Sequence, residues 1–429
     1  MKLYNTAEDT ASVFRELMVR ELISPEEDTV VILYDLKQIE ERLASLKNTF
    51  PANTFHTAAV KANPLVSVLK KVYGLGFGLE AASRGELALA EAAGAEKNEI
   101  VFDSPAKTLA EIHYALKSGI YLNTDSFDEI DRVRELANKN TIKAGVGVRV
   151  NPQVGSGTIS STSVAAQVSK FGIPLDESKR LKEYYLKNSF LTGIHLHIGS
   201  QGCPLELLVK GVKKAAAFAE EVNQESFALY GEQRILNFDL GGGLPVGYYH
   251  DKFPVTITDY FEMLKNEVPI IFSGKYRLIT EFGRYIYANS GTVISRVEYV
   301  KKFKEANIIM NHAGADLFLR KSYNPGDWHH EIALMDSKGK VKNSNSTSEY
   351  MVAGPLCFAG DIIERNAKLP EAEAGDYLII HDTGAYNLSA WSRYNSRQIP
   401  IVIGYDQSTG TFEILRKRET LDEIVNFWS

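Results

Sequence analysis

Short apolar runs recur along the first two thirds of the chain, and polar or glycine-containing segments separate them. Eight of these runs are typical of strands and cover residues 55–62, 76–83, 98–105, 119–126, 143–151, 191–200, 235–243 and 277–286. Apolar residues at helical spacing lie between them, at 85–94, 107–117, 126–138 and 205–222. A further helix is expected to start at Thr258 and Asp259 and to continue through Leu264. Strands that alternate with helices predict a parallel sheet with right-handed crossovers.

Eight strand–helix units over about 230 residues match the usual size of a (β/α)8 barrel, and the pattern favours this fold over an open, doubly wound sheet. Beyond residue 287 the pattern changes to strand-like runs joined by turn-rich stretches, which indicates an antiparallel β domain, either a barrel or a sandwich. Residues 29–35 also resemble a strand, and we expect that strand to pair with the C-terminal domain. The predicted domains are therefore a barrel at 36–286 and a discontinuous β domain formed by 1–35 and 287–429.

Composition removes several function classes. The 429 residues include 48 Lys and Arg against 54 Asp and Glu, a net charge of −6, and no basic block that would favour nucleic acid or an anionic membrane. No apolar window approaches the roughly 18 residues of a membrane span, and the first ten residues lack the apolar core of a secretory signal. Two cysteines, Cys203 and Cys357, cannot form a disulfide framework, so the sequence predicts a cytoplasmic protein.

Functional groups of a barrel enzyme lie at the C-terminal ends of its strands. Lys61 follows an apolar strand, where a lysine either extends its amine to solvent or serves as a Schiff-base nucleophile. The run Gly241-Gly242-Gly243 fits either a tight turn or a nest of backbone amides for a phosphate. His197 fits a core histidine or a metal ligand, with His195 on the same side of the strand. We expect no metal, because the sequence offers no obvious carboxylate and histidine set to complete such a site.

Six motifs follow one another along the chain: Ala59-Val60-Lys61-Ala62-Asn63, His197-Ile198-Gly199-Ser200-Gln201, Gly241-Gly242-Gly243, Glu281-Phe282-Gly283-Arg284, Gly354-Pro355-Leu356-Cys357 through Asp361, and Asp382-Thr383-Gly384-Ala385-Tyr386. Together they resemble the pyridoxal 5'-phosphate (PLP)-dependent decarboxylases of the alanine-racemase-like barrel fold. The closest likeness is to the diaminopimelate decarboxylase family, and ornithine and carboxynorspermidine decarboxylases are more distant relatives. The likeness runs from about residue 29 to the C-terminus.

This resemblance implies that PLP is the cofactor and that Lys61 binds it covalently. It implies that His197 stacks on the pyridine ring and that Glu281 faces the ring nitrogen. Cys357 is expected to return a proton to the α-carbon from the other subunit of a homodimer with shared active sites. The other expected cofactor contacts are Glu80, Arg149, Ser200, Gly241, Gly242, Gly243, Gly283, Arg284 and Tyr386, and the expected substrate contacts are Arg284, Arg320, Tyr323, Phe358, Asp361 and Tyr386.

The chemistry expected of these residues is consistent with decarboxylation. Loss of a carboxylate leaves a carbanion that the cofactor must absorb, and a carboxylate at the ring nitrogen keeps that nitrogen protonated. The related racemases place an arginine there, so Glu281 favours a decarboxylase. A thiol such as that of Cys357 is a suitable proton donor near neutral pH. A homologue that only binds a partner would be expected to have lost Lys61 or Cys357, and both are present.

The sequence departs from the family where substrate is bound. The diaminopimelate enzymes usually carry Glu directly after the cysteine, to read the distal amine, and this chain has Phe358. We therefore expect the same reaction on a modified or carrier-linked amino acid, such as a carrier-linked glutamyl group in aminoglycoside assembly or a citryl-diaminopropionate in siderophore assembly. The alternatives are meso-diaminopimelate, or a diamine-forming reaction of the ornithine or lysine type in which Asp361 binds a distal amine.

Overall fold

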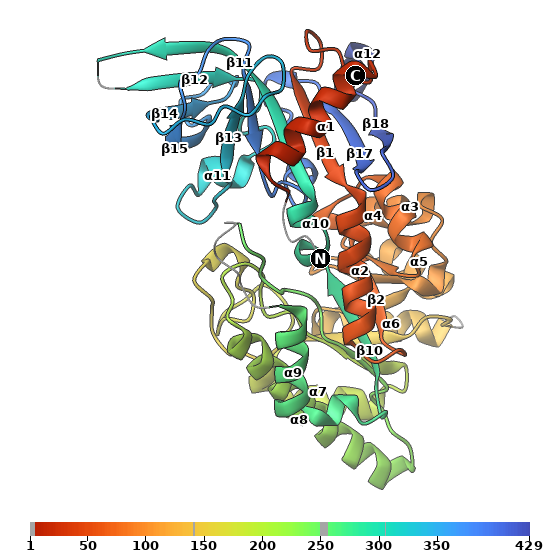
Figure 1. Ribbon diagram of the computed structural model, residues 1–429. Helices are drawn as coiled ribbons and strands as arrows, with labels where there is room; N and C mark the ends of the chain where they lie inside the picture. Colours follow the sequence, from red (N-terminus) through yellow and green to blue (C-terminus); the bar gives the residue numbers. More distant parts are fainter. Residues whose placement is uncertain (1–4, 140–141, 249–255, 305) are drawn as a thin grey trace. The chain divides into compact units, whose positions relative to one another are not determined.

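The computed structural model describes residues 5–139, 142–248, 256–304 and 306–429. The chain divides into two compact units, which are called the barrel unit (Arg42–Val246 and Pro254–Ile286) and the sheet unit (Met1–Glu41, Gly247–Phe253 and Tyr287–Ser429). The helices, labelled in Figure 1 where space allows, are α1 Ala7–Val19, α2 Leu36–Thr49, α3 Val66–Gly74, α4 Arg84–Ala92, α5 Leu109–Ser118, α6 Phe127–Lys139, α7 Ser178–Lys187, α8 Leu205–Tyr230, α9 Ile257–Glu267, α10 Arg284–Tyr287, α11 Leu319–Tyr323 and α12 Leu421–Trp428. The strands are β1 Val30–Asp35, β2 Phe55–Ala59, β3 Gly78–Ala81, β4 Ile100–Asp103, β5 Tyr121–Thr124, β6 Val146–Asn151, β7 Ile173–Pro174, β8 Leu191–His195, β9 Asn237–Asp239, β10 Arg277–Phe282, β11 Gly291–Lys302, β12 Asn307–Asn311, β13 Ile332–Met335, β14 Ser348–Ala353, β15 Ile362–Leu369, β16 Tyr377–Ile380, β17 Ile401–Asp406 and β18 Thr411–Arg416.

The barrel unit is a closed ring of eight parallel strands. The strands neighbour one another in the order β5, β4, β3, β2, β10, β9, β8 and β6, and β5 pairs with β6 to close the ring. Each of the eight strands falls within one of the eight runs that the apolar pattern predicts, so the barrel fold is confirmed. An open, doubly wound sheet would leave two unpaired edges, and the β5–β6 ladder excludes it.

Burial explains why these short strands form. Every residue of β3, β4, β5 and β6 is buried, since one face fills the barrel interior and the other is covered by the surrounding helices. The predicted start of α9 at Thr258 is wrong by two residues. The hydroxyl of Thr256 accepts the N–H of Asp259 at 3.1 Å, so Thr256 caps the helix. Helix α8 continues beyond the predicted end to Tyr230, and Gly231 ends it at a φ of 74°.

The described residues of the sheet unit form nine strands, and most of their pairings are antiparallel. Strand β1 pairs with β11 in antiparallel and with β17 in parallel orientation, so the predicted pairing of residues 29–35 with the C-terminal domain is confirmed. Strands β12 and β14 are also parallel, which makes the sheet mixed. Helix α1 places Phe14 and Leu17 in the core of this unit. No helix within the described ranges is both long and apolar enough to cross a lipid bilayer.

Candidate active site

Lys61 and Glu80 form the first pair of the site. Lys61 lies in a single 3-10 turn, Val60–Ala62, directly after β2, and Glu80 lies on the neighbouring strand β3. The Lys61 Nζ donates to Glu80 Oε1 at 2.7 Å and to Oε2 at 2.6 Å. The Lys61 side chain is 40% exposed, whereas the Glu80 side chain is completely buried. Burial raises the pKa of Glu80 to about 8, although the charge of Lys61 opposes that rise.

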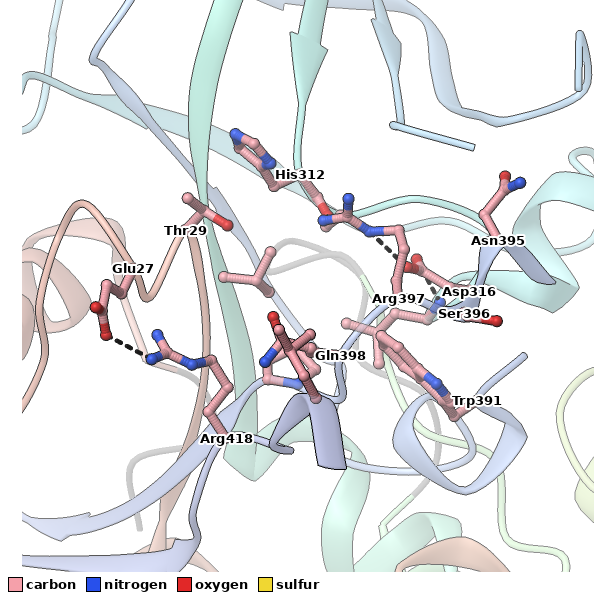
Figure 2. A pocket seen from close by; sticks show the side chains of 15 residues that line it. Glu27, Thr29, His312, Asp316, Trp391, Asn395, Ser396, Arg397, Gln398 and Arg418 are labelled. Carbon is pink, nitrogen blue, oxygen red and sulfur yellow. Dashed lines mark hydrogen bonds and ion pairs between the residues drawn. The ribbon is translucent and has the colours of Figure 1, made fainter. Parts of the chain in front are cut away.

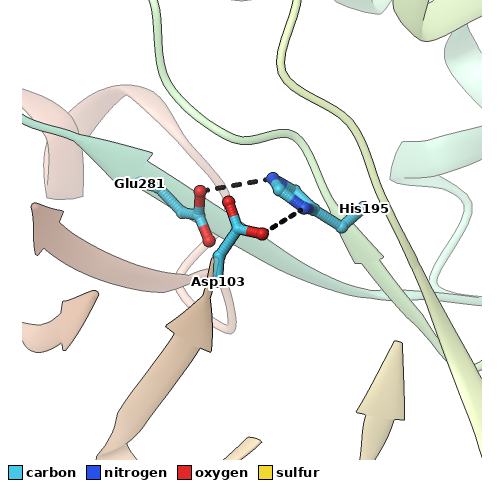
Figure 3. Close-up of side chains that lie close together, drawn as sticks. All are labelled: Asp103, His195 and Glu281. Carbon is cyan, nitrogen blue, oxygen red and sulfur yellow. Dashed lines mark ion pairs between the residues drawn. The ribbon is translucent and has the colours of Figure 1, made fainter. Parts of the chain in front are cut away.

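Three strand ends bring Asp103, His195 and Glu281 together (Figure 3). The imidazole of His195 lies between two carboxylates, with Nδ1 at 3.7 Å from Asp103 Oδ1 and Nε2 at 3.3 Å from Glu281 Oε2. The other oxygen of Asp103 accepts a hydrogen bond from Arg149 Nη1 at 3.0 Å. Arg149 therefore pairs with Asp103, and its guanidinium also lies over the ring of Phe171 at 4.4 Å.

His195, at the end of strand β8, and His197, in the loop after it, have pKa values that are shifted in opposite directions. Burial lowers the pKa of His195, but the charges of Asp103 and Glu281 outweigh burial and raise that pKa to about 9. Burial, followed by the positive charge of Arg149, lowers the pKa of His197 to about 3. His195 is therefore a cation and His197 a neutral ring near neutral pH.

The glycine run has a conformation that side chains would not permit. Gly241 and Gly243 have φ values of 62° and 105°. A Cβ on Gly242 would lie 2.3 Å from the carbonyl oxygen of Glu281, and one on Gly243 would lie 2.1 Å from that of Gly199. The Gly242 N–H donates to His197 Nδ1 at 3.2 Å. Gly241 and Gly242 are buried and Gly243 is partly buried, so the run requires glycine because it packs against neighbouring backbone beside His197.

Ser200 and Arg284 belong to the same unit and contact each other. Arg284, at the start of α10, donates from Nε to Ser200 Oγ at 3.0 Å. Only 4% of Arg284 is exposed. Gly283, directly before it, links the end of β10 to α10. This pair adds a cation and a hydroxyl to the same set of loops that carries the glycine run.

The sheet unit holds the remaining predicted residues. Arg320 on α11 lies between two aromatic rings, 4.5 Å from the ring centre of Tyr386 and 5.2 Å from that of Trp328. Tyr386 has a φ of 64°, which is uncommon for a residue with a side chain. The stacking fixes the guanidinium in one orientation.

Cys357 lies in an exposed loop bordered by aromatic side chains. Its N–H donates to Asn395 Oδ1 at 2.8 Å, and its carbonyl accepts the hydroxyl of Tyr394 at 3.1 Å. Phe358 stacks on Tyr323 at 6.3 Å and meets Tyr394 edge-on at 5.9 Å. Tyr323, Phe358 and Tyr394 are called the aromatic cluster below.

Asp361 supports this loop from beneath. Only 3% of the residue is exposed, and its two carboxylate oxygens accept the N–H groups of Ala315 and Leu356, each at 2.6 Å. A buried carboxylate held in this way stabilises the loop. These two bonds give Asp361 a structural role in the loop that carries Cys357, and its contact with substrate stays a prediction.

A cavity of about 250 Å³ lies in the sheet unit next to this loop, and Asn395 contributes to its wall (Figure 2). Its charged groups are already paired. Arg397 Nε lies 3.4 Å from Asp316 Oδ2, and Arg418 Nη2 lies 2.6 Å from Glu27 Oε2. The cavity therefore offers a ligand little uncompensated charge.

Residues 36–288 match the family model described as "Pyridoxal-dependent decarboxylase, pyridoxal binding domain". The chain belongs to this family of PLP-dependent decarboxylases. It is 32% identical over 402 residues to a diaminopimelate decarboxylase of Helicobacter pylori, covering 92% of this chain and 94% of the relative. A diaminopimelate decarboxylase of Aquifex aeolicus is also 32% identical over 402 residues, covering 92% of this chain and 91% of the relative. The crystal structure of a mutant diaminopimelate decarboxylase of H. pylori complexed with L-lysine matches with a TM-score of 0.82, at 31% identity over 93% of this chain and 96% of that one.

The barrel unit of this decarboxylase fits PLP at two points. Ser200 and Arg284 place a hydroxyl and a guanidinium next to Gly199, against which the partly buried Gly243 packs, and these groups suit a phosphate. Glu281 Oε1 is buried and accepts no hydrogen bond from an N–H group or a hydroxyl of the described residues, which suits a carboxylate that would accept the N–H of a pyridine ring. Bound PLP would be held by Lys61, the glycine run, Ser200 and Glu281.

Sequence reasoning missed Asp103 and gave no function to His195. The signal was present, since Asp103 is the last residue of β4 and strand ends carry the chemistry of a barrel. The carboxylate and histidine set that the sequence did not reveal is formed from three strands, β4, β8 and β10. Their adjacency depends on the closed ring and not on spacing along the chain.

Proposed function

We propose that this PLP-dependent decarboxylase removes the α-carboxylate of meso-diaminopimelate and releases L-lysine. The observation that carries this proposal is the similarity to enzymes named diaminopimelate decarboxylase over more than nine tenths of both chains. A site for the cofactor supports it, because the barrel unit places a lysine, a buried carboxylate and a glycine run on neighbouring strand ends.

Lys61 and Glu80 act together at the start of the reaction. Lys61 must lose a proton before its Nζ can bind the cofactor carbonyl, and Glu80 receives two hydrogen bonds from that nitrogen. Since burial raises the pKa of Glu80 to about 8, this carboxylate can take the proton near neutral pH and hold it beside Lys61.

When bound, PLP supplies an electron sink for the electrons left by the departing carboxylate. Glu281 supports that sink by accepting a hydrogen bond from the ring nitrogen. His197 is neutral and lies against the glycine run, so its flat ring can stack on the pyridine without adding charge. Arg284 would neutralise part of the phosphate charge, and the Ser200 hydroxyl beside it would donate a hydrogen bond to a phosphate oxygen.

Cys357 completes the reaction by donating a proton to the α-carbon. Its loop is exposed in the single chain, and Asp361 holds the loop in shape. We propose that Cys357 acts in the active site of a second copy of the chain, so that the working enzyme is a homodimer. Arg320, fixed between Tyr386 and Trp328, binds a carboxylate of the substrate.

The test is release of carbon dioxide and lysine from purified enzyme supplied with PLP. We expect turnover of meso-diaminopimelate and none of LL-diaminopimelate, L-ornithine or L-lysine, and Lys61→Ala should abolish it. A K61A variant with unchanged turnover, or an enzyme inactive on every one of these amino acids, would contradict the proposal.

One observation favours a second candidate substrate. Phe358 of the aromatic cluster occupies the position after Cys357, and an aromatic ring cannot accept an ammonium hydrogen bond as a carboxylate does. This suits an amino acid whose distal amine is blocked, such as an acylated or carrier-linked one. Comparison of meso-diaminopimelate with an analogue acylated on its distal amine distinguishes the two, and Phe358→Glu should raise kcat/KM only for the free amine.

A further inference from the structure

His195 lies next to Glu281, close enough for its charge to affect the protonation of that carboxylate. The imidazole is completely buried, and its two nitrogens face carboxylates from different strands, Asp103 on β4 and Glu281 on β10 (Figure 3). Glu281 Oε2 at 3.3 Å and Asp103 Oδ1 at 3.7 Å are the carboxylate oxygens nearest to these nitrogens, so charge attraction and packing hold the ring. An uncharged imidazole would have an acceptor nitrogen facing a carboxylate, which is unfavourable in a buried site.

The other charged groups around His195 are consistent with a cation at this position. Burial, followed by the charge of Glu281, raises the pKa of Asp239 on β9 well above its ordinary value, and a hydrogen bond between the two side chains adds to the rise, so Asp239 is a neutral acid beside Glu281. Arg149 and Lys61 lower the pKa of Asp103 despite its burial, and His195 contributes to the same effect. Glu80 is paired with Lys61, whose Nζ lies 2.6 Å from Glu80 Oε2. Two anions, Asp103 and Glu281, therefore remain facing His195.

The same three side chains have donor atoms within 4.8 Å of one another, which a metal site also requires. Side-chain cations already balance the charge of these carboxylates. Arg149 donates a hydrogen bond to Asp103 at 3.0 Å, and Lys61 adds a positive charge nearby. A divalent ion would be placed against these cations. The arrangement thus fits a buried proton better than a metal.

We propose that Asp103 and His195 are positioning residues for the cofactor: Asp103 keeps His195 protonated, His195 keeps Glu281 anionic, and Glu281 thereby keeps the proton on the pyridine nitrogen. The reason is proton affinity. A cation 3.3 Å from Glu281 Oε2 makes that carboxylate a weaker base, so the proton it shares with the ring stays on nitrogen. Asp103 balances the buried imidazolium and prevents its charge from destabilising the ring. This inference rests on the proposed contact of Glu281 with the ring nitrogen.

The test uses holoenzyme loaded with PLP that carries 15N at the ring nitrogen. The 15N chemical shift of native enzyme should report a protonated ring nitrogen from pH 7 to pH 8. In Asp103→Asn and in His195→Gln the shift should move toward the unprotonated value, and kcat should fall by about tenfold or more with little change in KM. None of these readings of the ring nitrogen requires the substrate to be identified.

The matched control is Asp125→Asn. Asp125 is also a buried carboxylate near Arg149, 3.9 Å from its Nε, but it does not face His195. We expect the 15N shift of D125N to equal that of native enzyme. Thermal unfolding of each holoenzyme shows which variants are folded. If D103N does not fold, His195→Gln alone tests the inference.

Native 15N shifts in both D103N and H195Q would overturn the inference, and Glu281→Gln separates the reasons. If E281Q alone deprotonates the ring, Glu281 acts without the other two residues and the proposed function stands. If E281Q also leaves the ring unchanged, the contact of Glu281 with the ring is wrong as well, and the inference falls with it. A change of the 15N shift in D125N as large as that in D103N would also overturn the inference. Loss of any negative charge near Arg149 would then be enough to deprotonate the ring nitrogen.

Discussion

The amine of Lys61 donates to both carboxylate oxygens of Glu80, at 2.7 and 2.6 Å, although one side chain is partly exposed and the other is completely buried. This pair joins two neighbouring strands of the barrel, and in the proposed function Glu80 takes the proton that Lys61 must lose. Glu80→Gln keeps the shape and removes the base. We expect covalent attachment of PLP to slow by about 100-fold, measured by the rise of visible absorbance after PLP is added to cofactor-free enzyme. Attachment at the native rate would show that solvent, and not Glu80, takes the proton.

Gly242 is expected to tolerate no side chain. A Cβ there would lie 2.3 Å from the Glu281 carbonyl oxygen, which is backbone and cannot move aside cheaply. Gly242→Ala should weaken PLP binding by at least about tenfold, or ~1.4 kcal/mol, in an equilibrium titration. The control is Gly74→Ala on α3, where a Cβ would meet nothing within 4 Å and affinity should not change.

The two thiols should differ in reactivity. Cys357 is exposed, whereas Cys203 is buried and its burial raises the pKa of its thiol. Iodoacetamide should therefore label Cys357 first. The measurement is mass spectrometry of protein that is labelled after mild dissociation into single chains. Cys357→Ala should retain PLP binding and lose most lysine formation. Full activity of C357A would show that Cys357 is not the proton donor.

Asp361 should matter for stability. Its two carboxylate oxygens accept the N–H groups of Ala315 and Leu356, and Asp361→Ala leaves both donors buried without these partners. The free energy of unfolding should fall by about 2–4 kcal/mol in urea denaturation of cofactor-free protein. Asp361→Asn, which keeps one oxygen, should lose less. A native midpoint for D361A would mean that the loop rearranges without cost.

Alkaline pH should destabilise the protein through His195. The pKa of this ring is raised to about 9 in the folded chain, above its ordinary value of 6.5. A raised pKa means that the folded state holds the proton more tightly, so the stabilisation is complete below about pH 6.5 and is lost as pH rises through about 9. The urea midpoint of cofactor-free native protein should therefore fall between pH 7 and pH 9.5. His195→Gln should show a smaller fall, and an equal fall in both would assign the effect to other groups.

The fold was predictable because the information is local. Each of the eight barrel strands, such as β6 at Val146–Asn151, is a short apolar run, and burial on both faces requires that composition. The pairing of β1 with the C-terminal strands also followed from an apolar run without a partner in the barrel. The predicted start of α9 is two residues too late, because Thr258 directly precedes Asp259 whereas Thr256, three residues before Asp259, has the spacing of a capping box.

Local patterns along the chain were sufficient to predict the barrel, the family and the residues that belong to short motifs, such as Lys61 and the glycine run. Which charges face each other became clear from the folded arrangement alone. Asp103, His195 and Glu281 lie on separate strands, and closure of the ring between β5 and β6 fixes the order in which strand ends meet. The folded arrangement also showed that Asp361 supports a loop, since burial and hydrogen bonds to backbone depend on residues far along the chain. Charge acts through space and not along sequence, so the protonation of His195 could be inferred only once its neighbours were in place.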